Sequence, residues 1–157
     1  MNNPFSLQNL APTYAAAEIV RKGGPGSGEN PGHPFRGNQF SEGEAAAKAA
    51  DTAHLTTQVE PGENRDHIVA AHKEIAEMHR QLAQRAIEKG DKWVARHNNE
   101  AAKAHDKAAR LQGHVSGPVR GDAASAYINR YRADKASYDA QDRSAEASFE
   151  ARRSTKL

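Results

Sequence analysis

The stretch from Arg21 to Phe40 reads RKGGPGSGENPGHPFRGNQF and is too rich in glycine and proline for a helix or an interior strand. Glycine loses the most conformational freedom on folding, and proline lacks the backbone N–H that a hydrogen-bonded ladder needs. Alanine-rich sequence that is typical of helices follows almost at once. This contrast divides the chain into an irregular, extended N-terminal arm, residues 1–40, and a helical body.

The composition predicts a weak core. Only 37% of the 157 residues are hydrophobic, and many of these are alanine, which buries little area. The chain has one Trp, four Phe, four Tyr and two Met. Burial of apolar surface contributes roughly 25 cal/mol per Å², so a core made mostly of alanine is weakly stabilised. We therefore expect an ordered form of the whole chain to draw stability from partners or from an assembly.

Charge and cysteine content exclude several classes of protein. The 22 basic and 20 acidic residues are interspersed, which is typical of solvated helix faces rather than of a nucleic-acid-binding surface. The absence of cysteine excludes disulfides and thiolate metal sites. No apolar run approaches the roughly 20 residues that span a bilayer, and the N-terminus lacks the features of a signal peptide. We expect no contact with a membrane.

The glycines of the arm do not form a nucleotide-binding loop. Gly23 and Gly28 have the spacing of a P-loop, but Glu29 and Asn30 stand where lysine and a hydroxyl residue are required. A carboxylate at the lysine position would repel phosphate. The dinucleotide-binding spacing that starts at Gly26 also fails, because Pro31 replaces its last glycine. We predict no cofactor.

The same stretch carries a resemblance to a known group of proteins. Residues 22–28 (KGGPGSG) and 32–39 (GHPFRGNQ) resemble a glycine-rich motif that recurs in tailed-bacteriophage virion and virion-associated proteins. The resemblance covers about 18 of the 157 residues and implies a phage context more than a named activity. It implies synthesis in the host bacterial cytoplasm and a place in the virion. The implied partners are other virion proteins, above all capsid subunits.

The arm offers side chains that could hold it on another protein. Aromatic rings dominate the energetics of many interfaces, so Phe35 and Phe40 are the expected anchors. The other expected contacts are polar side chains: His33, Arg36 and Asn38. An inert flexible linker, or a disordered tail of the kind that chain ends often form, is the alternative.

The body is predicted to be mainly α-helical. Ser41 and Glu44 form a capping-box pattern that starts a short helix, which ends before Thr56. A second helix is expected over 64–89 and a third over 91–112, with Gly90 as the turn between them. A joint this short predicts an antiparallel αα-hairpin. Residues 41–115 therefore form a short helix plus the hairpin, and residues 116–157 form a separate segment with one further helix.

Apolar residues at intervals of three, four and seven predict a narrow, coiled-coil-like seam in the hairpin. The expected members on residues 64–89 are Ile68, Ala71, Ile75, Met78, Leu82, Ala86 and Ile87. On residues 91–112 they are Val94, His97, Ala101, Ala104, Ala108 and Leu111. Trp93 is expected to cap the end of the hairpin, with partner binding as the alternative.

Folding about Gly90 predicts that His79 approaches His97 and that His72 faces the region of His105. We interpret these histidines as half-buried seam residues that set the pairing of the helices. Imidazole also binds zinc, but the sequence has no HExxH motif and no carboxylate in a convincing ligand position. We predict no metal site.

The last helix is expected over 123–152, with Asp122 as its N-cap. The Arg120-Gly121-Asp122 tripeptide is explained by that cap rather than by integrin recognition. A heptad stripe includes Tyr131, Tyr138 and Phe149. Tyrosine on an otherwise polar helix often marks a docking surface, so we favour a subunit contact over packing on the hairpin. Self-association is one form that such a contact could take.

No pattern in the sequence indicates catalysis. There is no nucleophile elbow, no cysteine nucleophile and no pair of carboxylates in an evident pocket. We predict a non-enzymatic structural protein of a tailed-phage particle, a minor component that is bound to the capsid or stabilises it. An internal DNA-associated or scaffolding protein of the head is the alternative, although only Arg152, Arg153 and Lys156 suggest nucleic acid. A cellular adaptor protein with a disordered arm is a third interpretation.

Overall fold

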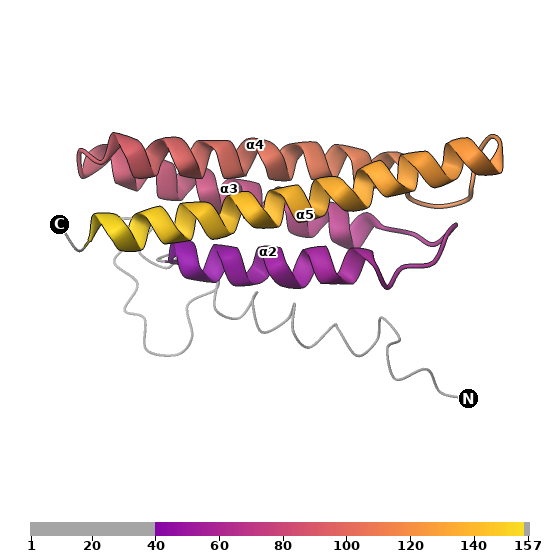
Figure 1. Ribbon diagram of the computed structural model, residues 1–157, viewed down its shortest axis with the longest axis horizontal. Helices are drawn as coiled ribbons and strands as arrows, with labels where there is room; N and C mark the ends of the chain where they lie inside the picture. The colour runs from indigo at the N-terminus through magenta and orange to yellow at the C-terminus, as the bar shows by residue number, and fades with distance from the viewer. Residues whose placement is uncertain (1–39, 156–157) are drawn as a thin grey trace, which may run out of the picture. The chain divides into compact units, whose positions relative to one another are not determined.

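The computed structural model describes residues 40–155, which form four helices. Figure 1 shows that these helices run along a common axis. Their bounds are Glu42–Thr56 (α2), Asp66–Glu88 (α3), Lys92–His114 (α4) and Ala123–Ser154 (α5). Each helix runs antiparallel to the next one along the chain. The residues that the structure describes contain no strand. The prediction of a mainly α-helical body is confirmed.

Three of the four described helices, α2, α4 and α5, begin where a short polar side chain satisfies a free N–H group of the first turn. Ser41 and Glu44 form the predicted capping box of α2. Asp91 accepts a hydrogen bond from the backbone N of Val94 at 3.0 Å, which caps α4. Asp122 accepts one from the backbone N of Ser125 at 2.9 Å, so its role as a cap is also confirmed.

Gly90 forms the turn between α3 and α4, whereas Gly113 does not end α4. Gly90 has a φ of 79°, a left-handed conformation that other residues rarely adopt. The prediction that α4 ends before Gly113 is wrong by two residues, because the helix runs on to His114. Gly113 is not among the glycines with positive φ, and Gly117 takes that conformation instead.

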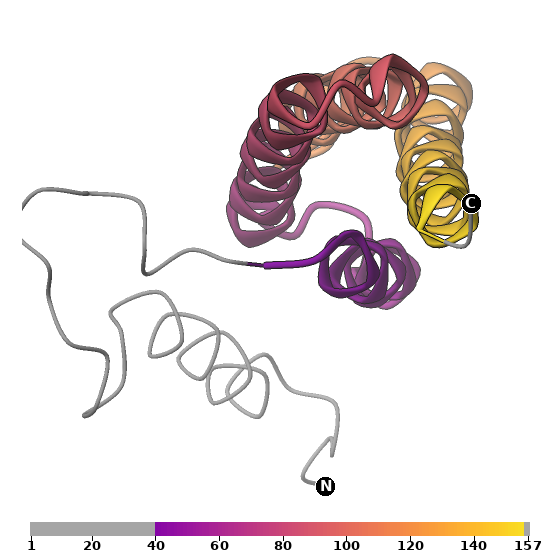
Figure 2. The same ribbon diagram turned by 90° about the vertical axis from the view of Figure 1, so that its left-hand side faces the viewer.

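Each helix packs on two neighbours: α3 on α2 and α4, and α5 on α4 and α2. Figure 2 shows the four helices end on, with α2 diagonally opposite α4 and α3 diagonally opposite α5. This is an up-down-up-down four-helix arrangement. The segment 116–157, which we predicted as separate, therefore contributes its helix to the same bundle as the hairpin.

The core is built mainly from alanine, as the composition predicts. The larger buried apolar side chains are few: Leu55, Val59, Ile68, Ile75, Leu82 and Val94. Burial of Ile68, Ile75, Leu82 and Val94 confirms the predicted seam, but Ile87 is 52% exposed and its prediction is wrong. Ala86 takes the inward position, and the next residue along a helix lies about 100° further round the axis.

Candidate functional site

A continuous chain of hydrogen-bonded polar side chains runs through the interior between α3, α4 and α5. We call it the polar network. All of its members except Asp134 are at most 1% exposed. They are Arg65, His72 and His79 at the start of α3 and along it, Asn98, His105 and Gln112 on α4, and Asp134, Ser137 and Ser144 on α5.

One end of the polar network is the Asn98 side chain. Its Nδ2 donates to the carbonyl of Val94 at 3.1 Å, so its Oδ1 is the acceptor that faces His79. His79 Nδ1, at 2.8 Å, must carry a hydrogen and donate it. The Nε2 of a neutral His79 then accepts from the hydroxyl of Ser144 at 2.7 Å. The tautomer of His79 follows from its partners.

The same reasoning passes to the next two histidines. Ser144 has used its only hydrogen, so His105 Nε2 donates to Ser144 Oγ at 2.8 Å. The free Nδ1 of His105 accepts from His72 Nδ1, which lies 2.8 Å away. His72 Nε2 then accepts from the hydroxyl of Ser137 at 2.8 Å. All three histidines are satisfied as neutral rings, each in one tautomer.

The other end of the polar network is an ion pair. Ser137 Oγ accepts from Gln112 Nε2 at 3.0 Å, and Gln112 Oε1 accepts from Arg65 Nη1 at 2.6 Å. The same Arg65 nitrogen lies 2.7 Å from Asp134 Oδ1. Arg65 Nη2 also reaches the carbonyl of Val59, which holds the α2–α3 connection against the bundle.

Burial keeps the three histidines neutral. It lowers the pKa of His72 to about 4. Burial, and to a smaller extent the neighbouring His72 and His79, lower the pKa of His105 to about 2. The pKa of His79 is lowered by burial as well, against a smaller opposing effect of its hydrogen bond to Asn98. At neutral pH the three rings are therefore uncharged, as the hydrogen bonds require.

The polar network has no open position for a ligand. Every ring nitrogen of its histidines already has a protein partner, so a metal ion would have to displace a hydrogen bond. Between residues 40 and 155, no group of three or more metal-binding side chains could hold an ion. The hydrogen bonds of the polar network join α3, α4 and α5 in one register.

The predicted histidine pairs are partly wrong. His72 does meet His105, but both rings are fully buried rather than half-buried. His79 meets Asn98 instead of His97: both observed pairs sum to 177, and His97 lies one residue, about 100° round the helix, away from the facing position. His97 packs edge-on against Trp93, with ring centroids 4.8 Å apart.

Sequence reasoning missed the serines, amides and arginine of the polar network, although a signal for them exists. Apart from Asp134, the members of the polar network recur every seven residues: 65, 72 and 79 before and along α3, 98, 105 and 112 on α4, and 137 and 144 on α5. Seven residues are close to two helical turns, so such residues share one face. A search for polar heptads, rather than apolar ones, would have found them.

The structure places the predicted partner-binding residues in three situations. His33, Phe35, Arg36 and Asn38 lie outside the described residues. Phe40 is partly buried, with the guanidinium of Arg85 5.1 Å from its ring centroid. The third group, on α5, faces outward.

Tyr131, Tyr138 and Phe149 are exposed by 60%, 41% and 57% on α5. With Tyr127 and Ile128 they make up five of the eight large hydrophobic side chains that are exposed in the described part of the chain. The buried face of the same helix consists of small residues: Ala133, Ala136, Ser137, Ala140, Ser144, Ala147 and Ser148. The predicted stripe therefore does not pack on the hairpin.

Trp93 does not close the end of the hairpin core as one interpretation expected. Its side chain is 55% exposed, and its Nε1 donates to Glu150 on α5 at 2.9 Å. The indole therefore bridges α4 and α5 at the surface.

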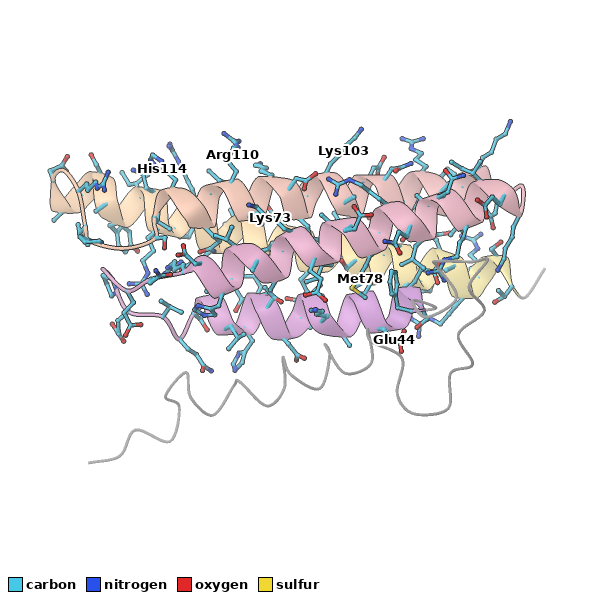
Figure 3. The ribbon with its side chains drawn as sticks, turned by 180° about the vertical axis from the view of Figure 1, so that it is seen from behind. Glu44, Lys73, Met78, Lys103, Arg110 and His114 are labelled. Carbon is cyan, nitrogen blue, oxygen red and sulfur yellow. The ribbon has the colours of Figure 1, made fainter. Side chains whose placement is uncertain are left out.

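A row of basic side chains follows the outer edge of α4. Figure 3 shows Lys103 and Arg110 pointing away from the bundle. The two acidic residues of α4 are engaged, Glu100 with Arg96 and Arg143, and Asp106 with Arg80. The exposed basic residues, which we call the α4 basic edge, are Lys92, Arg96, Lys103, Lys107 and Arg110.

Comparisons with known proteins add no relative. No family model, curated protein or solved structure matches this sequence or fold. None of the helices between residues 40 and 155 has the length and apolarity needed to cross a bilayer.

Proposed function

We propose that this protein is a non-enzymatic structural component of a tailed-phage particle, a minor protein that binds capsid subunits. In this role the extended N-terminal arm lies on neighbouring subunits and the helical bundle acts as a rigid body. Stabilisation would come from many non-covalent contacts rather than from any reaction.

The observation that carries the proposal is the contrast between a closed interior and an apolar exterior. Each histidine nitrogen of the polar network is occupied, whereas α5 directs large aromatic side chains outward. Monomeric soluble proteins rarely expose large contiguous apolar patches, which commonly mark interaction sites. Together with the resemblance of residues 22–39 to phage virion proteins, this supports a binding role.

Incorporation into particles tests the proposal. We expect mass spectrometry of purified virions, and of capsids emptied of DNA, to find the protein at a fixed copy number. Phe35→Ala with Phe40→Ala should lower that number, because aromatic anchors account for much of an interface's energy. Lys73→Ala, on the exposed surface of α3, is the control and should leave incorporation unchanged. Absence from particles, or unchanged incorporation of the double variant, would contradict the proposal.

The α4 basic edge favours the second candidate, an internal DNA-associated protein of the head. Contacts between basic side chains and phosphates weaken steeply with salt, because counterions are released on binding. On this alternative the protein would remain with the DNA at low salt and dissociate as salt rises. Lys103→Glu with Arg110→Glu should then abolish retention. Retention in emptied capsids, unaffected by the same two changes, would instead favour the capsid-bound role.

A further inference from the structure

We propose that the outward face of α5 pairs with the same face of a second copy of this chain, in antiparallel orientation, to form a symmetric dimer. This inference names the partner of the exposed aromatic residues and goes beyond the proposed function. It concerns the purified protein, so it can be tested whether or not the chain is a particle component.

The face is a complete heptad stripe. Eight residues on α5, separated alternately by four and three positions, are all exposed. Spacing of this kind is what two helices need to pack along a coiled-coil seam. The stripe spans 25 residue steps, about 38 Å at 1.5 Å per residue. Its members are Ala124, Ile128, Tyr131, Lys135, Tyr138, Asp142, Ala145 and Phe149.

The stripe is aimed directly away from its own bundle. The helical positions that lie opposite it carry the buried residues Ala133, Ala140 and Ala147, together with Ser137 and Ser144 of the polar network. Because α5 packs on α4 and α2 through that inner face, no other helix of the described chain covers the stripe. A second helix could therefore lie along it without disturbing the bundle.

An antiparallel register makes the stripe complementary to itself. When facing positions sum to 273, Ala124 lies opposite Phe149 and Ala145 lies opposite Ile128, so each large side chain meets a small one. In the middle layers the Lys135 ammonium meets the Tyr138 ring, a cation–π pairing, and the Tyr131 hydroxyl meets the Asp142 carboxylate. Parallel pairing would instead place Lys135 against Lys135 and Asp142 against Asp142.

Charges beside the seam agree with the same register. Arg132 and Asp139 are exposed on one flank of the stripe. In antiparallel coiled packing this flank faces the equivalent flank of the second helix, and the register places Arg132 of one copy beside Asp139 of the other. Two-fold symmetry makes this contact twice. Among residues 40–155 Asp139 pairs with the nearby Lys135 at 3.0 Å, and both Arg132 and Asp139 are exposed.

Sedimentation equilibrium of the full chain provides the test. The measured mass should rise with concentration from 17.0 kDa towards about twice that value. Arg132→Asp and Asp139→Arg should each weaken dimerisation by about tenfold or more, because each change sets like charges against each other at two places. The double variant, Arg132→Asp with Asp139→Arg, restores both pairs and should return the dissociation constant to within about threefold of the original.

The controls separate this face from other routes to association. Lys103→Asp reverses an exposed charge on α4, a helix that carries no residue of the stripe, and should leave the dimer unchanged. Circular dichroism should show full helicity in every variant, because all of the altered residues are exposed. A mass of one chain at all concentrations would overturn the proposal. A dimer insensitive to the single charge reversals, or not restored by the double variant, would overturn it equally.

Discussion

The inner face of α5 carries only alanine and serine at its buried positions, whereas the outer face of the same helix carries tyrosine, isoleucine and phenylalanine. Ordinary amphipathic helices place their bulk inward. Here the space inside is filled from the other side by histidine, asparagine and glutamine side chains of α3 and α4. Serine suits α5 because it is small and supplies a hydroxyl to those rings.

The difference teaches that burial in this bundle does not follow hydrophobicity: polar side chains fill the interior and large apolar side chains lie outside. A weak alanine core cannot by itself select one pairing of helices, since alanine stripes fit in several registers. The polar network can select one pairing, because the tautomer of each histidine depends on the hydrogen bonds that its neighbours in the network make. Buried networks of this kind are costly when partly satisfied. We therefore expect inward changes to act on folding and outward changes to act on association.

The largest expected effect is at the ion pair that ends the polar network. Asp134→Ala leaves the buried Arg65 guanidinium without its carboxylate and should lower the free energy of unfolding by about 3–5 kcal/mol. Urea denaturation of the full chain measures this loss. Asp139→Ala, five residues along the same helix but exposed, should cost less than about 1 kcal/mol. Equal losses in the two variants would show that the inner face is not special.

Acid should act almost as strongly. Below pH about 6.5 the unfolded chain protonates its histidines, whereas His72 and His105 stay neutral in the fold because their pKa values are about 4 and about 2. The unfolded state then binds more protons, so stability falls as pH falls. These two residues should remove about 3–4 kcal/mol between pH 7 and pH 5.

Denaturation curves at the two pH values check the acid effect. An unfolding free energy that is the same at pH 7 and pH 5 would mean that the histidines are not held neutral.

The hydroxyl group of Ser144, on the inner face of α5, should contribute measurably to the free energy of unfolding. Ser144→Ala removes the partner of both His79 and His105 and should cost about 1–3 kcal/mol. Ser148→Ala, four residues along the same helix, removes a hydroxyl that makes no comparable bond and should change stability by under about 0.5 kcal/mol. Thermal unfolding of the matched pair measures the contrast, and similar melting temperatures would count against the network.

The smallest effect is expected from removal of a whole aromatic ring on the outer face. Tyr131 is 60% exposed, so Tyr131→Ala should change the unfolding free energy of the monomer by less than about 0.5 kcal/mol. Denaturation at a dilution where the chain is monomeric provides the measurement. A loss larger than that of Ser144→Ala would reverse the proposed assignment of the two faces.

The helix starts and the main turn could be predicted because they depend on local chemistry. Ser41, Asp91 and Asp122 cap the helices that follow them, and Gly90 makes the sharp joint. These features need only the few residues on either side. The resemblance of the arm to phage proteins and the role that follows from it remain predictions.

The interior was only partly predictable for a physical reason. The meeting of His72 with His105 follows from folding the chain back at Gly90. Ser137 and Ser144, in contrast, each lie 65 residues along the chain from one of their histidine partners. A serine on a long helix carries no sign of burial by itself. Its inward position depends on which face α5 turns towards α3 and α4.

By itself, the sequence determined that this chain forms capped helices, a tight hairpin and an alanine-poor outer stripe on its last helix, because propensity and spacing are local properties. Only the tertiary structure decided that the small face of that helix is buried and the aromatic face is left outside. The reason is complementarity: the hydrogen-bonding side chains of α3 and α4 leave room for hydroxyl groups but not for rings. Local preferences cannot encode that fit, since it exists only between three helices at once.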